Sequence, residues 1–176
     1  PEGKEGQDIK WIRKDKLIDY SFPRYNDPIR TAITLPSLAC VTPPLTGGED
    51  EYIESILKIL KSGVKLVQLR PQTAKYNLTK NIALRLHEQI RALEAILMLN
   101  GKVSQFESSI FQGLHLNRVE ASKYFERPIS KKHLLSTSCH NLEELKHAIK
   151  IEVDFAYISP VKRTNSHPDS PSLGWE

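Results

Sequence analysis

Several features of membrane, secreted and metal-binding proteins are missing from this sequence. No apolar run reaches the length of about 18 residues that a transmembrane helix needs. Residues 1–10 are polar and charged and do not resemble a signal peptide. The only two cysteines, Cys40 and Cys139, lie inside separate apolar runs and lack metal-site spacing. Two isolated thiols are typical of a reducing compartment, so we expect a cytoplasmic protein with no membrane partner.

A concentrated basic surface is also missing. The formal net charge is +4, but the lysines and arginines are scattered, and no basic run is interleaved with aromatic residues. We therefore expect no nucleic-acid partner. A small anionic substrate fits the same excess of positive charge. With 176 residues, of which 39% are hydrophobic, the chain is long enough to bury the core of one ordinary domain.

Residues 1–36 differ in pattern from the rest of the chain. Residues 9–12 alternate like a short strand, residues 14–17 resemble the start of a helical turn, and residues 26–33 predict a helix with Pro28 in its first turn. After Pro36 short apolar runs alternate with amphipathic segments. We therefore divide the chain into residues 1–36 and a domain over residues 37–176.

Six short apolar runs in this domain predict β-strands. They are too apolar to have one face in water, which favours a parallel sheet covered by helices. The predicted strands cover residues 38–41, 65–69, 96–99, 113–116, 134–138 and 155–158.

The segments between these strands predict helices. One carries an apolar stripe from Ile53 to Leu60 and ends at Gly63. Asn77 is the expected cap of the next helix, and Asn141, with Glu144 three residues later, begins another. Alternating strands and helices predict right-handed βαβ units, and therefore an α/β fold.

Polar side chains gather where the predicted strands end, which is where the active sites of parallel barrels lie. Taken singly, Arg70 is also explained as a solvated strand end, and His115 as a core histidine with its hydrogen bonds satisfied. Their shared position nevertheless predicts one cleft bounded by Arg70, Asn100, His115, His140 and Thr164. The full candidate set is Gln68, Arg70, Asn100, Lys102, His115, Ser138, His140, Thr164, Ser166 and His167.

These residues form five motifs in order. Gln68-Leu69-Arg70, Asn100-Gly101, Gly113-Leu114-His115-Leu116, Ser138-Cys139-His140 and Ser159-Pro160-Val161 with Thr164 and Ser166 resemble the strand ends of the thiamine-phosphate synthase family. That family shows Q-x-R, N-D, G-V-H-L-G, S-x-H and G-P-x-x-x-T-x-T-K. The resemblance implies a parallel (β/α) TIM-type barrel. Six strands are about six of its eight, so we expect an incomplete barrel that lacks the phosphate-binding loops after strands seven and eight.

The resemblance also implies an activity. The synthase joins a pyrimidine pyrophosphate to a thiazole phosphate, and pyrophosphate leaves with the help of Mg²⁺. By resemblance, Gln68, Arg70 and Asn100 would hold the pyrimidine and its pyrophosphate, while Thr164 and Ser166 would contact the thiazole.

Departures from the synthase pattern weaken that expectation. Gln72 stands where the synthase has a lysine, Gly101 where it has a metal-binding aspartate, and His167 where a lysine ends the last motif. Glu120 aligns with a second acidic metal ligand and remains the candidate for Mg²⁺. Pyrophosphate and Mg²⁺ binding should both suffer.

The sister family of thiazole tautomerases resembles this chain more closely at these positions. It has N-G-R where this chain has Asn100-Gly101-Lys102, and a histidine acid and base where His140 stands. It aromatises a thiazole carboxylate phosphate without a metal. Imidazole suits proton transfer near neutral pH. The alternative for His140 is an exposed histidine at a helix start, beside Asn141.

The first segment resembles the C-terminal end of a MutT-type Nudix hydrolase. The resemblance rests on Glu5-Gly6-Gln7, Trp11, residues 19–23, Asn26 and Pro28. The Glu-rich box of such hydrolases, G-x5-E-x7-R-E-x2-E-E, is missing. Residues 1–36 therefore cannot hydrolyse nucleotides alone.

Three functions follow as expectations. The first is a thiamine-biosynthesis domain that binds a small phosphorylated thiazole or pyrimidine, as a synthase-family transferase or a tautomerase isomerase. The second is a catalytically degenerate binding or regulatory module fused to a Nudix (8-oxo-dGTP-type) hydrolase. The third is a scaffold for oligomerisation, because an open barrel exposes two sheet edges. We expect a second copy or a missing chain segment to close the barrel, and the fragment alone to be inactive.

Overall fold

The computed structural model describes residues 3–72, 75–162 and 172–175. Its chain contacts divide it into two compact units, one ending at Ser37 and one beginning at Leu38. No helix among the described residues is long and apolar enough to cross a membrane.

The first unit contains short helices. These are η1 (Lys14–Asp19), η2 (Arg24–Asn26) and α1 (Asp27–Thr34), with Pro28 in the first turn of α1 as predicted. The predicted strand at residues 9–12 is wrong, because this segment has no regular secondary structure. A lone strand leaves its backbone groups unpaired, and the described residues offer this segment no ladder partner.

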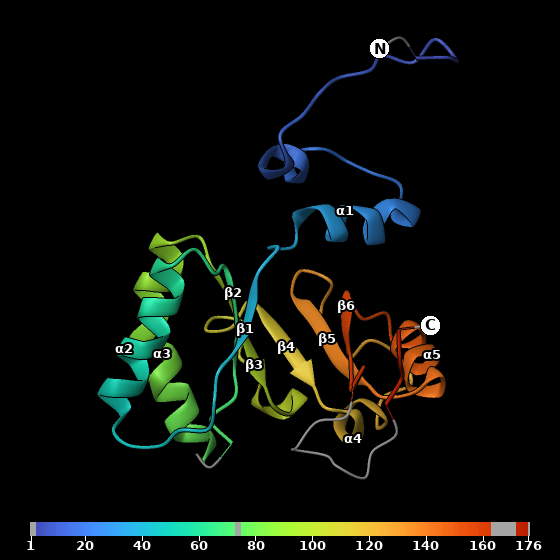
Figure 1. Ribbon diagram of the computed structural model, residues 1–176. Helices are drawn as coiled ribbons and strands as arrows, with labels where there is room; N and C mark the ends of the chain where they lie inside the picture. Colours follow the sequence, from blue (N-terminus) through green and yellow to red (C-terminus); the bar gives the residue numbers. More distant parts are fainter. Residues whose placement is uncertain (1–2, 73–74, 163–171, 176) are drawn as a thin grey trace. The chain divides into compact units, whose positions relative to one another are not determined.

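The second unit is built on one parallel sheet of six strands. The strands are β1 (Ala39–Val41), β2 (Leu66–Leu69), β3 (Ile96–Asn100), β4 (Gly113–Leu116), β5 (Leu134–Cys139) and β6 (Phe155–Ile158). Each pairs in parallel with the next, in the order β1-β2-β3-β4-β5-β6. The sheet curls into part of a TIM-type barrel (Figure 1). All six predicted strands and the α/β class are confirmed.

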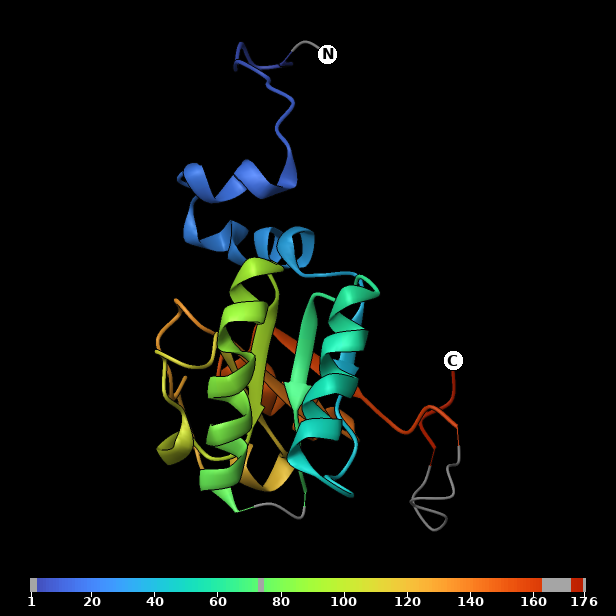
Figure 2. The ribbon, with the colours of Figure 1, turned by 90° about the vertical axis from the view of Figure 1, so that its left-hand side faces the viewer.

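Helices follow the strands on the outer side of the curl. They are α2 (Glu49–Lys61), α3 (Tyr76–Ala92), the short η3 (Val103–Gln105), α4 (Arg118–Ala121) and α5 (Leu142–Lys150). Figure 2 shows α2 and α3 side by side over the strands.

Two of the three helix signals are confirmed. Gly63 follows α2 with a positive φ of 101°, a conformation that glycine adopts without strain. Asn141 caps α5 by accepting the Glu144 amide at 2.8 Å. The predicted cap at Asn77 is wrong, because Lys75 is the cap and α3 begins at Tyr76. The Tyr76 hydroxyl donates to the Gln105 carbonyl and to Glu107, which fixes the first residue of the helix.

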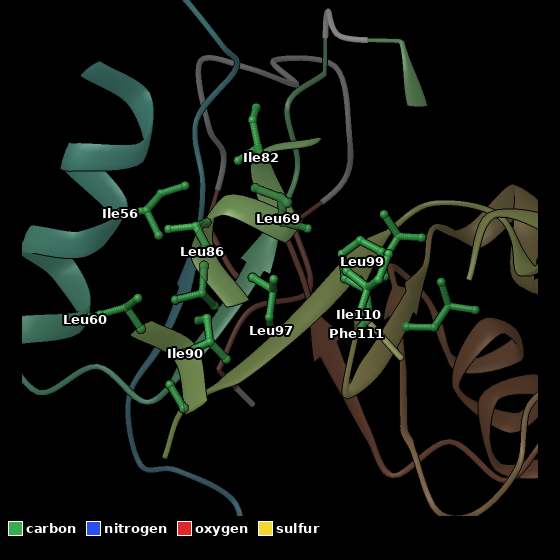
Figure 3. Packing of buried hydrophobic residues seen from close by; sticks show 14 of the residues in the cluster. Ile56, Leu60, Leu69, Ile82, Leu86, Ile90, Leu97, Leu99, Ile110 and Phe111 are labelled. Atoms are coloured by element: carbon green, nitrogen blue, oxygen red, sulfur yellow. The ribbon is translucent and has the colours of Figure 1, made fainter. Parts of the chain in front are cut away.

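The two faces of the sheet have different composition, because successive side chains of a strand point to opposite sides. On the outer face, leucine side chains of β2 and β3 pack in one buried cluster with α2 and α3 (Figure 3), while β5 contacts α4 and α5. Ile56, Ile82 and Leu86 of these helices are fully buried. Burying each such side chain stabilises the fold by about 1.5–3 kcal/mol relative to leaving it exposed. The inner face carries the polar residues in register, with Asn100 beside His115 and Ser138 beside Tyr157. The core and the polar cleft therefore occupy opposite faces.

The sheet has two edges among the described residues, since β1 pairs only with β2 and β6 only with β5. Apolar side chains near them are exposed, with Val41 at 41% and Ile158 at 52%. That a second copy or a further segment covers these edges stays a prediction.

Candidate functional site

A cleft of about 1020 Å³ lies at the C-terminal ends of the strands. Side chains from all six strands or the loops that follow them line it, including Val41, Gln68, Asn100, His115, Ser138 and Tyr157. Because every strand is parallel, these ends meet at one edge, although the residues lie more than a hundred positions apart.

The structure brings most of the candidate residues together. Gln68, Arg70, Asn100, His115, Ser138 and His140 all line the cleft. Thr164, Ser166 and His167 lie outside the described residues.

Two candidates lie away from the cleft. Lys102 is the first residue before η3 and is not among the lining residues. Glu120 is buried in α4, where its carboxylate pairs with Lys123 at 2.6 Å. A Mg²⁺ site that includes Glu120 is therefore not supported by its position, since a lysine already occupies one of its oxygens.

Arg70 directly follows β2, and hydrogen bonds hold its backbone in place. Its amide donates to the Thr42 hydroxyl at 2.8 Å, and Tyr52 donates to the same oxygen at 2.7 Å. With its amide oxygen turned toward Arg70, Gln72 accepts two hydrogen bonds from the guanidinium at 2.6 and 3.2 Å. An amide adds no charge of its own, so the residue in place of the family's lysine orients Arg70 without adding a second cation.

His115 is held at both ring nitrogens. Nδ1 lies 2.9 Å from the Ser136 hydroxyl and Nε2 lies 3.1 Å from the Ser138 hydroxyl. Burial, followed by the charge of Arg70, lowers the pKa of His115 from 6.5 to about 4. The ring is therefore neutral near pH 7, and it donates to one serine while accepting from the other.

His140 has a different environment. Its Nδ1 lies 2.9 Å from Glu144 Oε2, and its backbone amide donates to the same oxygen at 2.8 Å. Burial opposes ionisation of Glu144, but the hydrogen bonds from His140 outweigh it and keep the pKa of this carboxyl below its usual value. The His140 side chain is 35% exposed, and the residue lines the cleft. With Nδ1 held by a carboxylate, Nε2 is the nitrogen left for a ligand.

The described residues do not fit the Mg²⁺ site that the synthase pattern implies. A Cβ atom at Gly101 would lie 2.9 Å from Gln105 Oε1 and 3.2 Å from Leu99 Cγ. The same Gln105 oxygen accepts the Lys102 amide at 2.9 Å, so an aspartate here would displace a bonded side chain. No group of three histidine, cysteine, aspartate or glutamate side chains suited to a metal ion occurs within residues 3–72, 75–162 and 172–175.

Sequence reasoning missed three residues of this site. Glu144 was expected only as part of a helix start, although its spacing of four from His140 was a usable signal. Arg118 and Tyr157 also line the cleft. Tyr157 looked like one apolar residue of a buried strand, and only the register places it on the inner face.

Comparisons with known proteins agree with this geometry. A family model described as "Thiamine monophosphate synthase" matches residues 38–176. A protein of Aquifex aeolicus, provisionally named thiamine-phosphate synthase 2, is 29% identical over 140 residues, which are 80% of this chain and 75% of that protein. The thiamine-phosphate synthase of Thermosynechococcus vestitus is 25% identical over 133 residues, 75% of this chain but only 38% of its own length.

Solved structures share the fold. The thiamine phosphate pyrophosphorylase of Pyrococcus furiosus superposes with a TM-score of 0.59 at 20% identity, covering 77% of this chain and 64% of that one. At this identity the likeness establishes the fold alone. The family model, in contrast, spans well over half of the chain, and the chain therefore belongs to the thiamine monophosphate synthase family.

Proposed function

We propose that the protein containing this chain binds a phosphorylated thiazole in the cleft and moves a proton on its ring, as a thiazole tautomerase does. The observation that carries this proposal is the His140–Glu144 pair at the cleft, 2.9 Å apart. A base oriented by a carboxylate is a recurring arrangement for proton transfer.

In the proposed reaction His140 Nε2 takes a proton from a ring carbon of the thiazole carboxylate phosphate. Glu144 stabilises the imidazolium that forms, since its carboxylate accepts a hydrogen bond from Nδ1–H and stays ionised. The imidazolium then returns a proton at a second position, and the ring becomes aromatic. The balance is one proton removed and one returned, without redox change.

The rest of the cleft supplies binding. The Arg70 guanidinium suits a phosphate or carboxylate, because its fork pairs with two oxygens. Gln68, Asn100 and Ser138 add polar contacts. His115 does not compete as a base, since its pKa of about 4 leaves it a weak proton acceptor.

The synthase reaction would need more charge-stabilising groups in the same cleft. Departing pyrophosphate carries several negative charges, and each missing stabilising group costs about 2.7–4 kcal/mol. Gln72, Gly101 and His167 each replace such a group. The crowding around Gly101 also leaves little room for the aspartate that the synthase pattern has at this position.

A second candidate is a binding module that has lost catalysis and serves a fused Nudix hydrolase. The replacement of the family's lysine by Gln72, bonded to Arg70, favours it. This candidate predicts binding of the thiazole phosphate without turnover, whereas the tautomerase predicts both.

Variants of the proton-transfer pair in the full-length protein test the proposal. We expect His140→Ala to lower kcat for tautomerisation by about 10²–10⁴-fold, and Glu144→Gln to lower it by at least about tenfold, because an amide stabilises the imidazolium less. Glu143→Gln is the matched control, since Glu143 is 79% exposed and pairs only with Lys146 in the described structure. An unchanged kcat in His140→Ala would contradict the role assigned to His140. If the wild-type protein bound the thiazole phosphate but did not tautomerise it, the second candidate would be favoured.

A further inference from the structure

Tyr157 lies on the inner face of β6 and faces the cleft. Its backbone is in register with Ser138 of β5. Its ring contacts His115 edge-on, with centroids 5.4 Å apart and planes at 73°, and contacts Phe155 in the same manner at 5.5 Å. These edge-on contacts orient the ring, and the residue lines the cleft beside His115 and Ser138.

The Tyr157 hydroxyl is buried and has no hydrogen-bond partner within the part of the chain that the structure describes. A buried polar atom without a partner typically costs about 1–3 kcal/mol. Among the described residues one other buried side-chain atom is in the same condition, Gln68 Nε2. Gln68 also lines the cleft and is 2% exposed.

Both atoms are available as donors. Gln68 Oε1 accepts from Asn100 Nδ2 at 2.8 Å, which turns the Nε2 donors away from Asn100. Burial raises the pKa of Tyr157, so its hydroxyl keeps its proton at neutral pH. Buried donors are normally hydrogen-bonded, and the residues that the structure describes supply no acceptor to either of these two donors on the polar face.

We propose that the Tyr157 hydroxyl is a ligand-binding group that donates, together with Gln68 Nε2, to acceptor atoms on the buried edge of a planar heteroaromatic ligand. The ligand class is a ring with a nitrogen or carboxylate oxygen at that edge. Both donors are almost closed to solvent without ligand, so binding includes a small tilt of the tyrosine ring. This inference rests on the proposed function and adds a residue that selects the ligand.

The inference predicts an unusual combination of effects for Tyr157→Phe in the full-length protein. The affinity for hydroxyethylthiazole phosphate, measured by calorimetry, should fall about five- to tenfold, because one hydrogen bond to the ligand is lost. The urea midpoint of the ligand-free protein should stay the same or rise, because the removed hydroxyl has no partner there. In tautomerisation of the thiazole carboxylate phosphate, KM should rise while kcat stays unchanged, since Tyr157 moves no proton.

Tyr124→Phe is the matched control, because Tyr124 packs against the outer core and does not line the cleft. Its affinity should equal that of the wild type. Affinity of Tyr157→Phe within twofold of the wild type would overturn the inference while leaving the proposed function intact. A lower urea midpoint with unchanged affinity would overturn it too, as it would make the hydroxyl structural. A wild type that does not bind hydroxyethylthiazole phosphate would overturn the proposed function and this inference with it.

Discussion

Two histidines of the cleft show how the surroundings of a residue determine its chemistry. His115 is 3% exposed and lies between two serine hydroxyls. His140 is partly exposed and pairs with a carboxylate. A neutral, fully bonded ring orients neighbours, whereas a ring with one free nitrogen and a carboxylate partner exchanges protons. By resemblance the sequence assigned proton transfer to His140, but the residues alone did not show which histidine has a carboxylate partner.

The buried neutral His115 predicts a pH-dependent stability. Its pKa falls from 6.5 in the unfolded chain to about 4 in the fold, so the unfolded chain binds the proton more readily. The stability is therefore complete above about pH 6.5 and is lost as the pH falls toward 4. As the pH is lowered from about 7.5 to about 5.5, this histidine should reduce the free energy of unfolding by about 1 kcal/mol, which urea unfolding measures.

A variant that lacks only His115 isolates this effect. His115→Gln should be less stable overall but should lose about 1 kcal/mol less between the two pH values than the wild type. His87→Gln, on α3, should keep the wild-type difference. An unchanged pH dependence in His115→Gln would mean that other groups cause it.

At the same scale, the candidate site was only partly predictable. Strand-end position predicted that Arg70, Asn100, His115 and His140 line one cleft, because parallel strands share an edge. Lys102 does not line the cleft, and Glu120, a candidate by resemblance rather than by strand-end position, lies in α4 and pairs with Lys123. Strand-end position also missed Tyr157, because facing into or away from the curl depends on register, which apolar runs do not specify.

The structural elements were more predictable than the side chains. Continuous apolar runs marked all six strands to within one or two residues. Residues 9–12 failed because alternation marks a strand only where another strand pairs with it. Asn77 failed as a cap because tertiary hydrogen bonds of Tyr76 set the helix start. Local signals therefore failed where distant contacts determined the outcome.

One arginine joins structural elements at the N-terminal ends of the strands, opposite the ends that form the cleft. Arg127, in the segment before β5, donates to the carbonyls of Ile129, His133 and Glu152 and pairs with Asp154 at 2.7 Å. Its side chain is only 7% exposed. Asp154 in turn accepts the Leu135 amide, so this arginine holds the start of β5 to the turn before β6.

Removing this arginine should destabilise the fold without touching the cleft. We expect Arg127→Met to lower the free energy of unfolding by about 3 kcal/mol, because the partly buried Asp154 loses its ion pair and three carbonyls lose a donor. Lys131→Met is the control, since Lys131 is 49% exposed in its pair with Glu152 and such pairs contribute under about 1 kcal/mol. Equal urea midpoints for the two variants would refute the role assigned to Arg127.

For the whole molecule, the chain combines the family's fold with strand-end residues that, by the resemblance described above, depart from the synthase motifs. The family model covers residues 38–176, and the sheet supplies the family's arrangement of strand ends. The charged groups around that edge differ, with Gln72 bonded to Arg70 and Gly101 enclosed by Gln105 and Leu99. If the resemblance assigns these positions correctly, this cleft has fewer charged groups than the synthase pattern, which favours the proposed reaction because it needs fewer of them.

The central claim is that this site transfers protons rather than joining two substrates. The most direct measurement gives the full-length protein both reactions in parallel and quantifies the products by chromatography. One reaction contains the thiazole carboxylate phosphate with a chelator. The other contains the pyrimidine pyrophosphate, the thiazole phosphate and Mg²⁺. We predict tautomerisation that the chelator does not reduce, and little or no thiamine phosphate. Robust Mg²⁺-dependent formation of thiamine phosphate would contradict the account.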